Sequence, residues 1–221
     1  QNKGNSGTSA CKNERLKRME SFKYSRILFW ILSGFIISTI ESNKCKKKEP
    51  KNHHGVQPFI VIGQEEEEFK ENLLRAIIPQ MSTEWIVQFK FKLTAAHTHI
   101  KVKCNLIHLS QSGAGETYGD RTPSVYVYKE TMEMRIFTAI NGKHKYKGYT
   151  VQYGIDYNVE IHQRYKSGGK YTFFIIINGK RIMKTVNTQA EQFYDVKVYA
   201  SNLWEPACNG TISDFKITNF L

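Results

Sequence analysis

The stretch that decides the fold is Tyr157-Asn-Val-Glu-Ile-His-Gln-Arg-Tyr165, followed by Tyr171-Thr-Phe-Phe-Ile-Ile-Ile-Asn178-Gly179-Lys180. Both runs are short and rich in β-branched and aromatic residues, as β-strands are. Asn178-Gly179 stands between apolar runs and tolerates the positive φ angles of a type I′ turn, so it predicts a hairpin. Phe193–Ser201 and Gly210–Thr218 have a similar composition. The final third of the chain is therefore predicted to be a series of β-strands.

Upstream, apolar and polar residues alternate between Glu84 and Leu93, which predicts a strand with one buried face. Trp85, Val87, Phe89, Phe91 and Leu93 share that face. Leu73–Ile78, closed by Pro79, is expected as a first strand. The acidic run Glu65–Glu68 is expected as a solvated loop, because like charges repel.

Further strands are expected at His99–Leu109, Ser124–Tyr128, Glu133–Ala139 and Tyr146–Tyr153, with a second hairpin turn at Asn141-Gly142. The alternation places His108 on the same face as Cys104 and Leu106, where it is expected as a hydrogen-bonded core histidine. Repeated strands without a helical pattern predict an all-β fold, an antiparallel two-sheet sandwich.

The net charge of +12 lies mostly outside the predicted sandwich. Residues 1–18 and 43–56 each contribute +4, residues 19–42 contribute zero, and the remaining 165 residues carry +4. A body with this mild excess is not expected to bind nucleic acid.

The N-terminal segment resembles a secretory leader. Lys23 and Arg26 precede an uncharged apolar run at 27–40, and the small residue Ser42 follows, so 19–42 is predicted to be a signal peptide. If 27–40 stays uncleaved, the same residues are a membrane anchor. Residues 1–18 precede the first methionine and are interpreted as translated upstream sequence or a disordered tail.

Residues 43–56 are interpreted as a basic linker, and 57–221 as the folded domain. A polar, basic run cannot bury apolar surface, so the linker is expected to be disordered. The alternative is an arm that binds acidic glycans or an anionic surface. His53 and His54, adjacent and without other ligands in spacing, are a weak metal signal.

After signal cleavage, Cys45, Cys104 and Cys208 remain, and an odd number leaves one unpaired. Cys104 and Cys208 are predicted to be both paired or both unpaired, with Cys45 available for an inter-chain bond; a Cys45–Cys208 bond is the alternative. Asn209-Gly210-Thr211 is the only glycosylation sequon, so Asn209 is a candidate glycan acceptor.

The order of the motifs resembles that of laminin G-like, concanavalin A-like domains. The resemblance rests on Leu73–Pro79, Glu84–Phe91, Ile107–Ser110, Tyr118–Pro123, Ala139–Gly142, Ile177–Lys180, Val196–Trp204 and Gly210–Phe215. It covers roughly residues 59–221. It implies a jelly-roll of two antiparallel sheets and extracellular binding of glycans or proteins, often with Ca²⁺. The fold also occurs in glycosidases, so it does not fix the function.

Two functional motifs of other proteins with this fold are incomplete in this sequence. Trp204-Glu205 lacks the downstream arginine of the galectin sugar site. Glu130 and Glu133 do not form the paired-carboxylate pattern that a retaining glycosidase requires. The chain is therefore interpreted as non-enzymatic.

Loops held by a rigid scaffold carry most binding residues, which makes Asp120, Arg121, Asn202 and Trp204 the candidate ligand contacts. Asp120 can offer a carboxylate to Ca²⁺ or to a sugar hydroxyl, and Trp204 can stack on a sugar face. The alternative is a loop ion pair between Asp120 and Arg121, with Trp204 filling the core. The sequence predicts a secreted, lectin-like module for an extracellular glycan or glycoprotein. The alternatives are a structural or interaction protein of the same fold, or a glycosidase.

Overall fold

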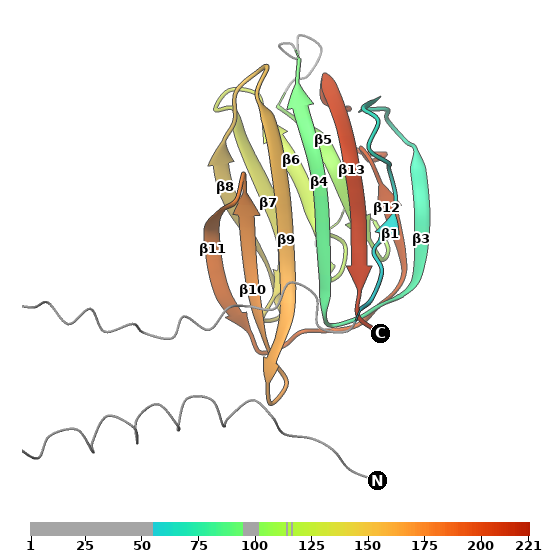
Figure 1. The fold of residues 1–221 in the computed structure, drawn as a ribbon, viewed down its shortest axis with the longest axis vertical. Helices are drawn as coiled ribbons and strands as arrows, with labels where there is room; N and C mark the ends of the chain where they lie inside the picture. Colours follow the sequence, from blue (N-terminus) through green and yellow to red (C-terminus); the bar gives the residue numbers. More distant parts are fainter. Residues whose placement is uncertain (1–54, 95–101, 114, 116) are drawn as a thin grey trace, which may run out of the picture. The chain divides into compact units, whose positions relative to one another are not determined.

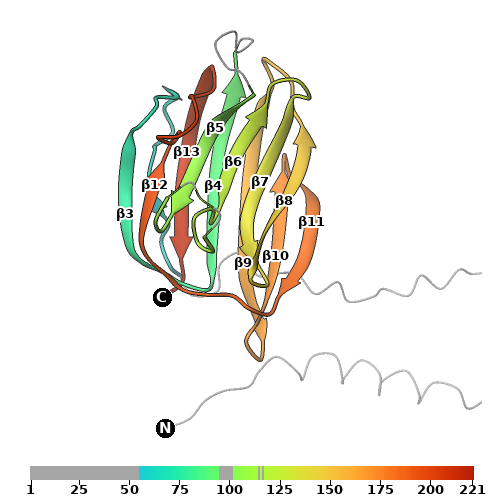
Figure 2. The same cartoon turned by 180° about the vertical axis from the view of Figure 1, so that it is seen from behind.

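The structure is a computed structural model that describes residues 55–94, 102–113, 115 and 117–221. In this part of the chain, thirteen strands form two antiparallel sheets that pack face to face, without any helix (Figures 1 and 2). This arrangement confirms the predicted all-β, two-sheet jelly-roll sandwich.

The larger sheet has seven strands in the order β1-β13-β4-β9-β10-β11, with β2 also paired to β13. Their bounds are β1 Phe59–Ile60, β2 Glu67–Glu68, β4 Trp85–Leu93, β9 Asp156–Ser167, β10 Lys170–Ile177, β11 Lys180–Asn187 and β13 Gly210–Asn219. The smaller sheet has six strands in the order β3-β12-β5-β6-β7-β8. Their bounds are β3 Leu74–Met81, β5 Lys103–Ser110, β6 Ser124–Tyr128, β7 Glu133–Ile140, β8 Lys143–Thr150 and β12 Phe193–Tyr199.

The core lies between the two sheets and follows the alternation read from β4. Every second side chain from Trp85 to Leu93 is buried, and these pack in one cluster with Val125 and Ile136 of the six-stranded sheet. Phe89 is fully buried and meets the Phe215 ring edge-on, with ring centroids 6.2 Å apart. This burial is the main force holding the sheets together.

Both predicted hairpin turns are present. Asn141 and Gly142 have φ angles of 53° and 69°, and Asn178 and Gly179 have 48° and 76°. Asparagine and glycine tolerate this left-handed region, which a two-residue turn between twisted strands requires. The first turn joins β7 to β8, and the second joins β10 to β11.

The acidic run, expected to be a solvated loop, is one only in its first half: Glu65 and Glu66 lie exposed in a loop. Glu67 and Glu68 form β2, which pairs with the start of β13, and Glu67 accepts a hydrogen bond from Arg75 at 2.6 Å. Pro79, expected to close the first strand, instead lies inside β3. β3 is the edge strand of its sheet, where the missing N–H of proline need not face a neighbour.

The alternation expected along His99–Leu109 does not persist through β5. The register against β6 shifts between Asn105 and Ile107, so the strand contains a bulge at Leu106. Beyond the bulge, Ile107 and Leu109 join the core, and His108 lies on the other face. His108 is buried, as predicted, but outside the core and not on the face of Cys104. Residues 99–101 lie outside the described residues.

The predicted upstream segment 1–18, signal peptide 19–42 and most of the basic linker, including Cys45 and the histidine pair, also lie outside the described residues. In the part of the chain that is described, no helix has the length and apolar character needed to cross a membrane.

Candidate functional site

The outer face of the six-stranded sheet carries a set of aromatic side chains. Val125 and Val127 of β6 and Ile136 of β7 belong to the core. Since side chains alternate along a strand, Tyr126 and Phe137 must face away from it. Phe137 pairs in register with Tyr146 of β8, which brings that ring to the same outer face.

Six rings on this face touch in sequence across strands β12, β5, β6, β7 and β8, and we call them the ring row. The centroid distances are 6.2 Å for Tyr199–Trp204, 5.3 Å for Trp204–His108, 6.2 Å for His108–Tyr126, 5.8 Å for Tyr126–Phe137 and 5.2 Å for Phe137–Tyr146. Trp204 is 43% exposed and Tyr146 is 54% exposed, whereas His108 and Tyr126 between them are buried. The ring row therefore has an exposed ring near each end and buried rings between them.

Three cations lie over these rings or their neighbours. The Arg135 guanidinium is 3.9 Å from the Tyr128 ring centroid and 5.1 Å from that of Tyr146. The Lys103 ammonium lies 4.7 Å from the Tyr126 ring centroid, and the Arg121 guanidinium lies 5.3 Å from that of Phe137. Cation–π contacts of this kind hold the charged groups at the protein surface.

Two of these cations also have acidic partners. The Arg135 Nε–H donates to Glu133 Oε2 at 2.6 Å, and the Lys103 ammonium lies 3.1 Å from Glu205 Oε1. Each of the four side chains is about a quarter to a third exposed. The face therefore combines rings, hydrogen-bond donors and acceptors within reach of solvent.

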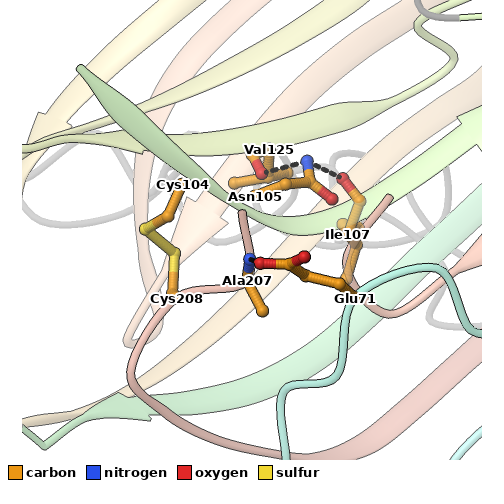
Figure 3. The surroundings of a disulfide bond; sticks show 7 residues. All are labelled: Glu71, Cys104, Asn105, Ile107, Val125, Ala207 and Cys208. Atoms are coloured by element: carbon orange, nitrogen blue, oxygen red, sulfur yellow. Dashed lines mark hydrogen bonds between the residues drawn. A yellow bond between two sulfur atoms is a disulfide. The ribbon is translucent and has the colours of Figure 1, made fainter. Parts of the chain in front are cut away.

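The loop that carries Trp204 is fixed to β5 by a disulfide. Figure 3 shows the bond between Cys104 and Cys208, which confirms that these two cysteines pair with each other. The same loop is held by Asn105 N–H, which donates to the carbonyl of Pro206 at 3.0 Å. The segment between β12 and β13, residues 200–209, is therefore tethered to the sheet, and we call it the arch.

Hydrogen bonds join the segments around the disulfide. The Asn105 amide donates to the carbonyls of Ile107 and Val125, and the Ala207 N–H donates to Glu71 Oε1 (Figure 3). Asn105 and Ala207 also form an isolated parallel bridge. These contacts fix the arch to the bulged part of β5.

Asn202 supports the arch from below. Its Oδ1 accepts hydrogen bonds from the backbone N–H groups of Trp204 and Glu205, at 3.0 and 2.8 Å. Its amide lies 3.2 Å from His108 Nδ1 and 3.3 Å from the Tyr126 hydroxyl. Asn202 is fully buried, so it supports the backbone of the exposed Trp204 from inside the protein.

His108 joins the arch to the loop that follows β5. Its Nε2 lies 3.3 Å from the carbonyl of Gly113, which requires an N–H on that nitrogen and leaves Nδ1 as the acceptor. Burial lowers the pKa of His108 to about 4 and raises the pKa of Tyr126 to about 12. Both side chains are therefore uncharged near neutral pH.

Asp120, predicted as a ligand contact, is only 2% exposed. Its Oδ1 accepts hydrogen bonds from Ser112 N–H at 3.2 Å, from Gly113 N–H at 3.0 Å and from the Ser112 hydroxyl. Burial raises the pKa of Asp120, but the hydrogen bonds from Ser112 and Gly113 outweigh burial and hold the pKa below its usual value. The carboxylate organises its own loop.

Ca²⁺ was the cofactor implied by the resemblance. Among the residues that the structure describes, no three His, Cys, Asp or Glu side chains gather as metal ligands. The Asp120 carboxylate is engaged by its loop. One oxygen of Asp120 is thus committed to its own loop, and the Ca²⁺ implied by the resemblance stays a prediction.

The four predicted contact residues thus divide into two pairs. Trp204 and Arg121 reach the outer face, whereas Asp120 and Asn202 are buried beneath it. The two buried residues converge on His108, Asp120 through Gly113 and Asn202 directly. The sequence reading missed Tyr126, Tyr128, Arg135, Phe137 and Tyr146, although the alternation in Ser124–Tyr128 already places two tyrosines on one face.

A groove of about 530 Å³ lies elsewhere, along strands β4, β9 and β13 of the seven-stranded sheet. Some of its polar side chains pair with one another, as in the contact between Lys92 and Asp156 at 2.8 Å. Its two aromatic lining residues, Phe91 and Tyr157, are buried core residues. We favour the ring row as the functional face because it offers exposed rings.

The fold and this face define a jelly-roll sandwich with an aromatic outer surface on one sheet. No protein-family model matches the chain, and no curated protein matches its sequence. Among solved structures, the chain is similar to the native heptameric SAP-like pentraxin from Limulus polyphemus, with 13% identity and a TM-score of 0.43 over 78% of this chain and 75% of that chain.

Two further similar structures are the endo-beta-1,4-glucuronan lyase from the fungus Trichoderma reesei and the carbohydrate-binding module CBM66 from Bacillus subtilis. The first has 13% identity and a TM-score of 0.43 over 77% of this chain and 89% of that chain. The second has 8% identity and a TM-score of 0.40 over 73% of this chain and 100% of that chain. A likeness at this level concerns the arrangement of strands and says nothing of what this chain binds.

Proposed function

We propose that the chain is a secreted, non-enzymatic, lectin-like module that binds an extracellular glycan or glycoprotein across the ring row. The observation that carries this proposal is the pair of exposed rings, Trp204 and Tyr146, near the ends of one continuous row. A sugar presents an apolar C–H face to such rings and hydroxyls to the polar groups beside them. A few placed polar groups on an aromatic surface are what a ligand site requires.

The dimensions of the row fit a short oligosaccharide. Neighbouring strands lie about 4.8 Å apart, so the three steps from β5 to β8 span roughly 14 Å. Trp204 lies over His108 of β5, and Tyr146 is on β8. Arg121, Lys103 and Glu205 flank the rings between these ends and offer hydrogen bonds to hydroxyl groups.

Secretion is supported by the disulfide between Cys104 and Cys208, because such bonds form and persist in oxidising compartments. The predicted signal peptide at 19–42 and the sequon at Asn209 belong to the same proposal. Release of the chain into the medium of expressing cells, with its N-terminus after residue 42, is the expected result. Retention in the membrane fraction through 27–40 would contradict cleavage.

A glycan array with the purified full chain tests the binding proposal. Wild-type protein is expected to bind a limited set of glycans, and Trp204→Ala and Tyr146→Ala are each expected to weaken that binding. A wild-type chain that binds no glycan and no extracellular glycoprotein would overturn the proposal.

The second candidate is a structural or interaction protein of the same fold. The observation in its favour is exposed apolar surface on two edge strands, at Phe59 and Ile60 of β1 and at Leu74 and Ile77 of β3. Exposed apolar edges favour association with another chain. Concentration-dependent sedimentation without glycan binding would support this candidate.

A glycosidase is less well supported by the geometry. Glu133, the nearest candidate acid, is held at 2.6 Å by the Arg135 Nε–H, which commits its carboxylate to an ion pair. Hydrolysis also requires a second carboxyl group at a defined separation. Release of reducing ends from any polysaccharide, lost in Glu133→Gln, would establish this candidate instead.

A further inference from the structure

We infer that the glycan bound on the ring row carries an acidic group, a carboxylate or a sulfate, and that Arg135 binds that group. This inference rests on the proposed function and narrows its ligand class. Arg135 lies on β7, an interior strand of its sheet, and its side chain is 27% exposed. An arginine on the outer face of an interior strand does not serve to protect a sheet edge, so its place among the rings calls for another reason.

The guanidinium of Arg135 is held in place before any ligand arrives. It lies 3.9 Å from the centroid of Tyr128 on β6 and 5.1 Å from that of Tyr146 on β8, so rings from both neighbouring strands contact it. Its Nε–H is used by Glu133, and guanidinium has four other N–H donors on its terminal nitrogens. That planar fork matches a carboxylate or sulfate with two parallel hydrogen bonds.

The Glu133 carboxylate lies against a glycine on the next strand. A Cβ atom at Gly148 would collide with the Glu133 side chain where it now lies, so an alanine there would displace the carboxylate from its place beside Arg135. Gly148 pairs in register with Arg135 itself. The clamp of Glu133, Arg135 and Gly148 thus fixes the Nε side of the guanidinium and orients the fork, which lowers the ordering cost of binding.

The charges around Arg135 are of both signs. Glu133 and Glu205 each pair with one cation of the face, and Arg121 lies over the Phe137 ring. The exposed Lys143, Lys145 and Lys147 of β8 alternate with Tyr146, so they point to the opposite face of the sheet, where they protect its edge. The inferred preference for an anion therefore rests on the guanidinium of Arg135 and not on the surrounding charge.

The decisive experiment compares probes that differ only in the acidic group. The pairs are sialyllactose with lactose, a hyaluronan tetrasaccharide with its carboxyl-reduced form, and a sulfated with a desulfated chondroitin tetrasaccharide. Dissociation constants are measured by calorimetry in 0.15 M NaCl. For at least one pair, the acidic member is expected to bind about tenfold tighter, as for a charge-assisted hydrogen bond. The first two pairs report a carboxylate, and the third reports a sulfate.

Arg135→Ala is expected to abolish the preference, so that the acidic and the neutral member of each pair bind with the same Kd. Arg135→Lys is expected to keep only part of the preference, because an ammonium group keeps the charge but lacks the planar pair of donors of guanidinium. Gly148→Ala is expected to reduce the preference without changing the charge of the face. Lys170→Ala, which removes an exposed cation at the start of β10 in the other sheet, is the control and should behave as wild type.

The outcomes separate this inference from the proposed function. Equal or tighter binding of the neutral members by wild type overturns the acidic ligand and leaves glycan binding standing. An unchanged preference in a folded Arg135→Ala protein overturns the role of Arg135. Binding of a single-stranded oligonucleotide more tightly than every glycan, or of no glycan at all, overturns both. Circular dichroism and melting temperature show which variants are folded.

Discussion

Asn202 Oδ1 accepts a hydrogen bond from the backbone N–H of Trp204 at 3.0 Å, which places a fully buried amide directly beneath a half-exposed indole. The same amide group reaches His108 and the Tyr126 hydroxyl. The loop that carries the exposed ring is therefore continuous, through hydrogen bonds, with strands β5 and β6. The orientation of Trp204 therefore depends on a fully buried side chain.

Asn202→Ala should consequently weaken both stability and binding. Removing the side chain leaves the N–H groups of Trp204 and Glu205 without this acceptor, which costs about 1–3 kcal/mol of unfolding free energy. Chemical denaturation measures the first effect, and glycan titration measures the second. An Asn202→Ala protein with unchanged affinity would show that the arch holds Trp204 without this support.

The pH dependence of stability should report His108. Burial lowers its pKa from 6.5 to about 4, so between these values the unfolded chain binds a proton that the folded chain excludes. The stabilisation is complete above pH 6.5 and declines as pH falls toward 4, by about 3 kcal/mol. Urea denaturation at pH 7, 5.5 and 4.5 measures the decline. His108→Gln should flatten this part of the profile, and an unchanged slope in that variant would assign the decline to other groups.

The disulfide should contribute much of the stability of the domain. Cys104 and Cys208 are separated by 104 residues, and closing a loop of that size restricts the unfolded chain. In the chain-entropy model the bond is worth about 4–5 kcal/mol. The double variant Cys104→Ala and Cys208→Ala should lose stability of that order and bind glycan less well, because the arch loses its tether.

Cys45→Ser is the matched control for the disulfide variants. It should leave the unfolding free energy unchanged, and it should remove any disulfide-linked dimer if Cys45 bonds between chains. Non-reducing peptide mapping of the wild-type chain should give a Cys104–Cys208 peptide. A Cys45–Cys208 peptide would contradict the pairing seen in the structure.

Passage through the secretory pathway, as proposed, is expected to lead to glycosylation at Asn209. The residue stands between Cys208 and β13, is partly exposed, and precedes Gly210-Thr211 in the sequon. Treatment with an amidase that removes N-linked glycans should lower the mass of the wild-type chain and leave Asn209→Gln unchanged. A secreted wild-type chain whose mass does not shift would contradict this assignment.

Local patterns were enough to predict most of the strands, because each pattern acts within a few residues. Alternation from Trp85 to Leu93 identified the buried face of β4, and two Asn-Gly pairs identified hairpin turns. Alternation failed at Leu106, where the bulge depends on pairing with β6 rather than on composition. The loop expected from charge repulsion failed at Glu67 and Glu68, whose pairing with β13 joins segments far apart in the chain.

The site was harder to predict because it depends on which strands are neighbours. Trp204 was identified as a candidate from its loop, but its contact with His108 requires β12 to lie beside β5. Tyr146 and Arg135 had no special signal in their own segments. They can be recognised as part of the site only once the strand order is known, because that order places Tyr128, Arg135 and Tyr146 side by side.

The most direct test of the ring row is the glycan affinity of Trp204→Ala and Tyr146→Ala beside the control Tyr165→Ala. Tyr165 is 52% exposed on β9 of the other sheet, so the control removes an exposed ring of the same kind away from the row. With the best glycan from the array, each row variant should bind at least tenfold more weakly, and the control should match wild type within about twofold. Wild-type affinity in both folded row variants, or an equal loss in the control, would contradict binding on the ring row.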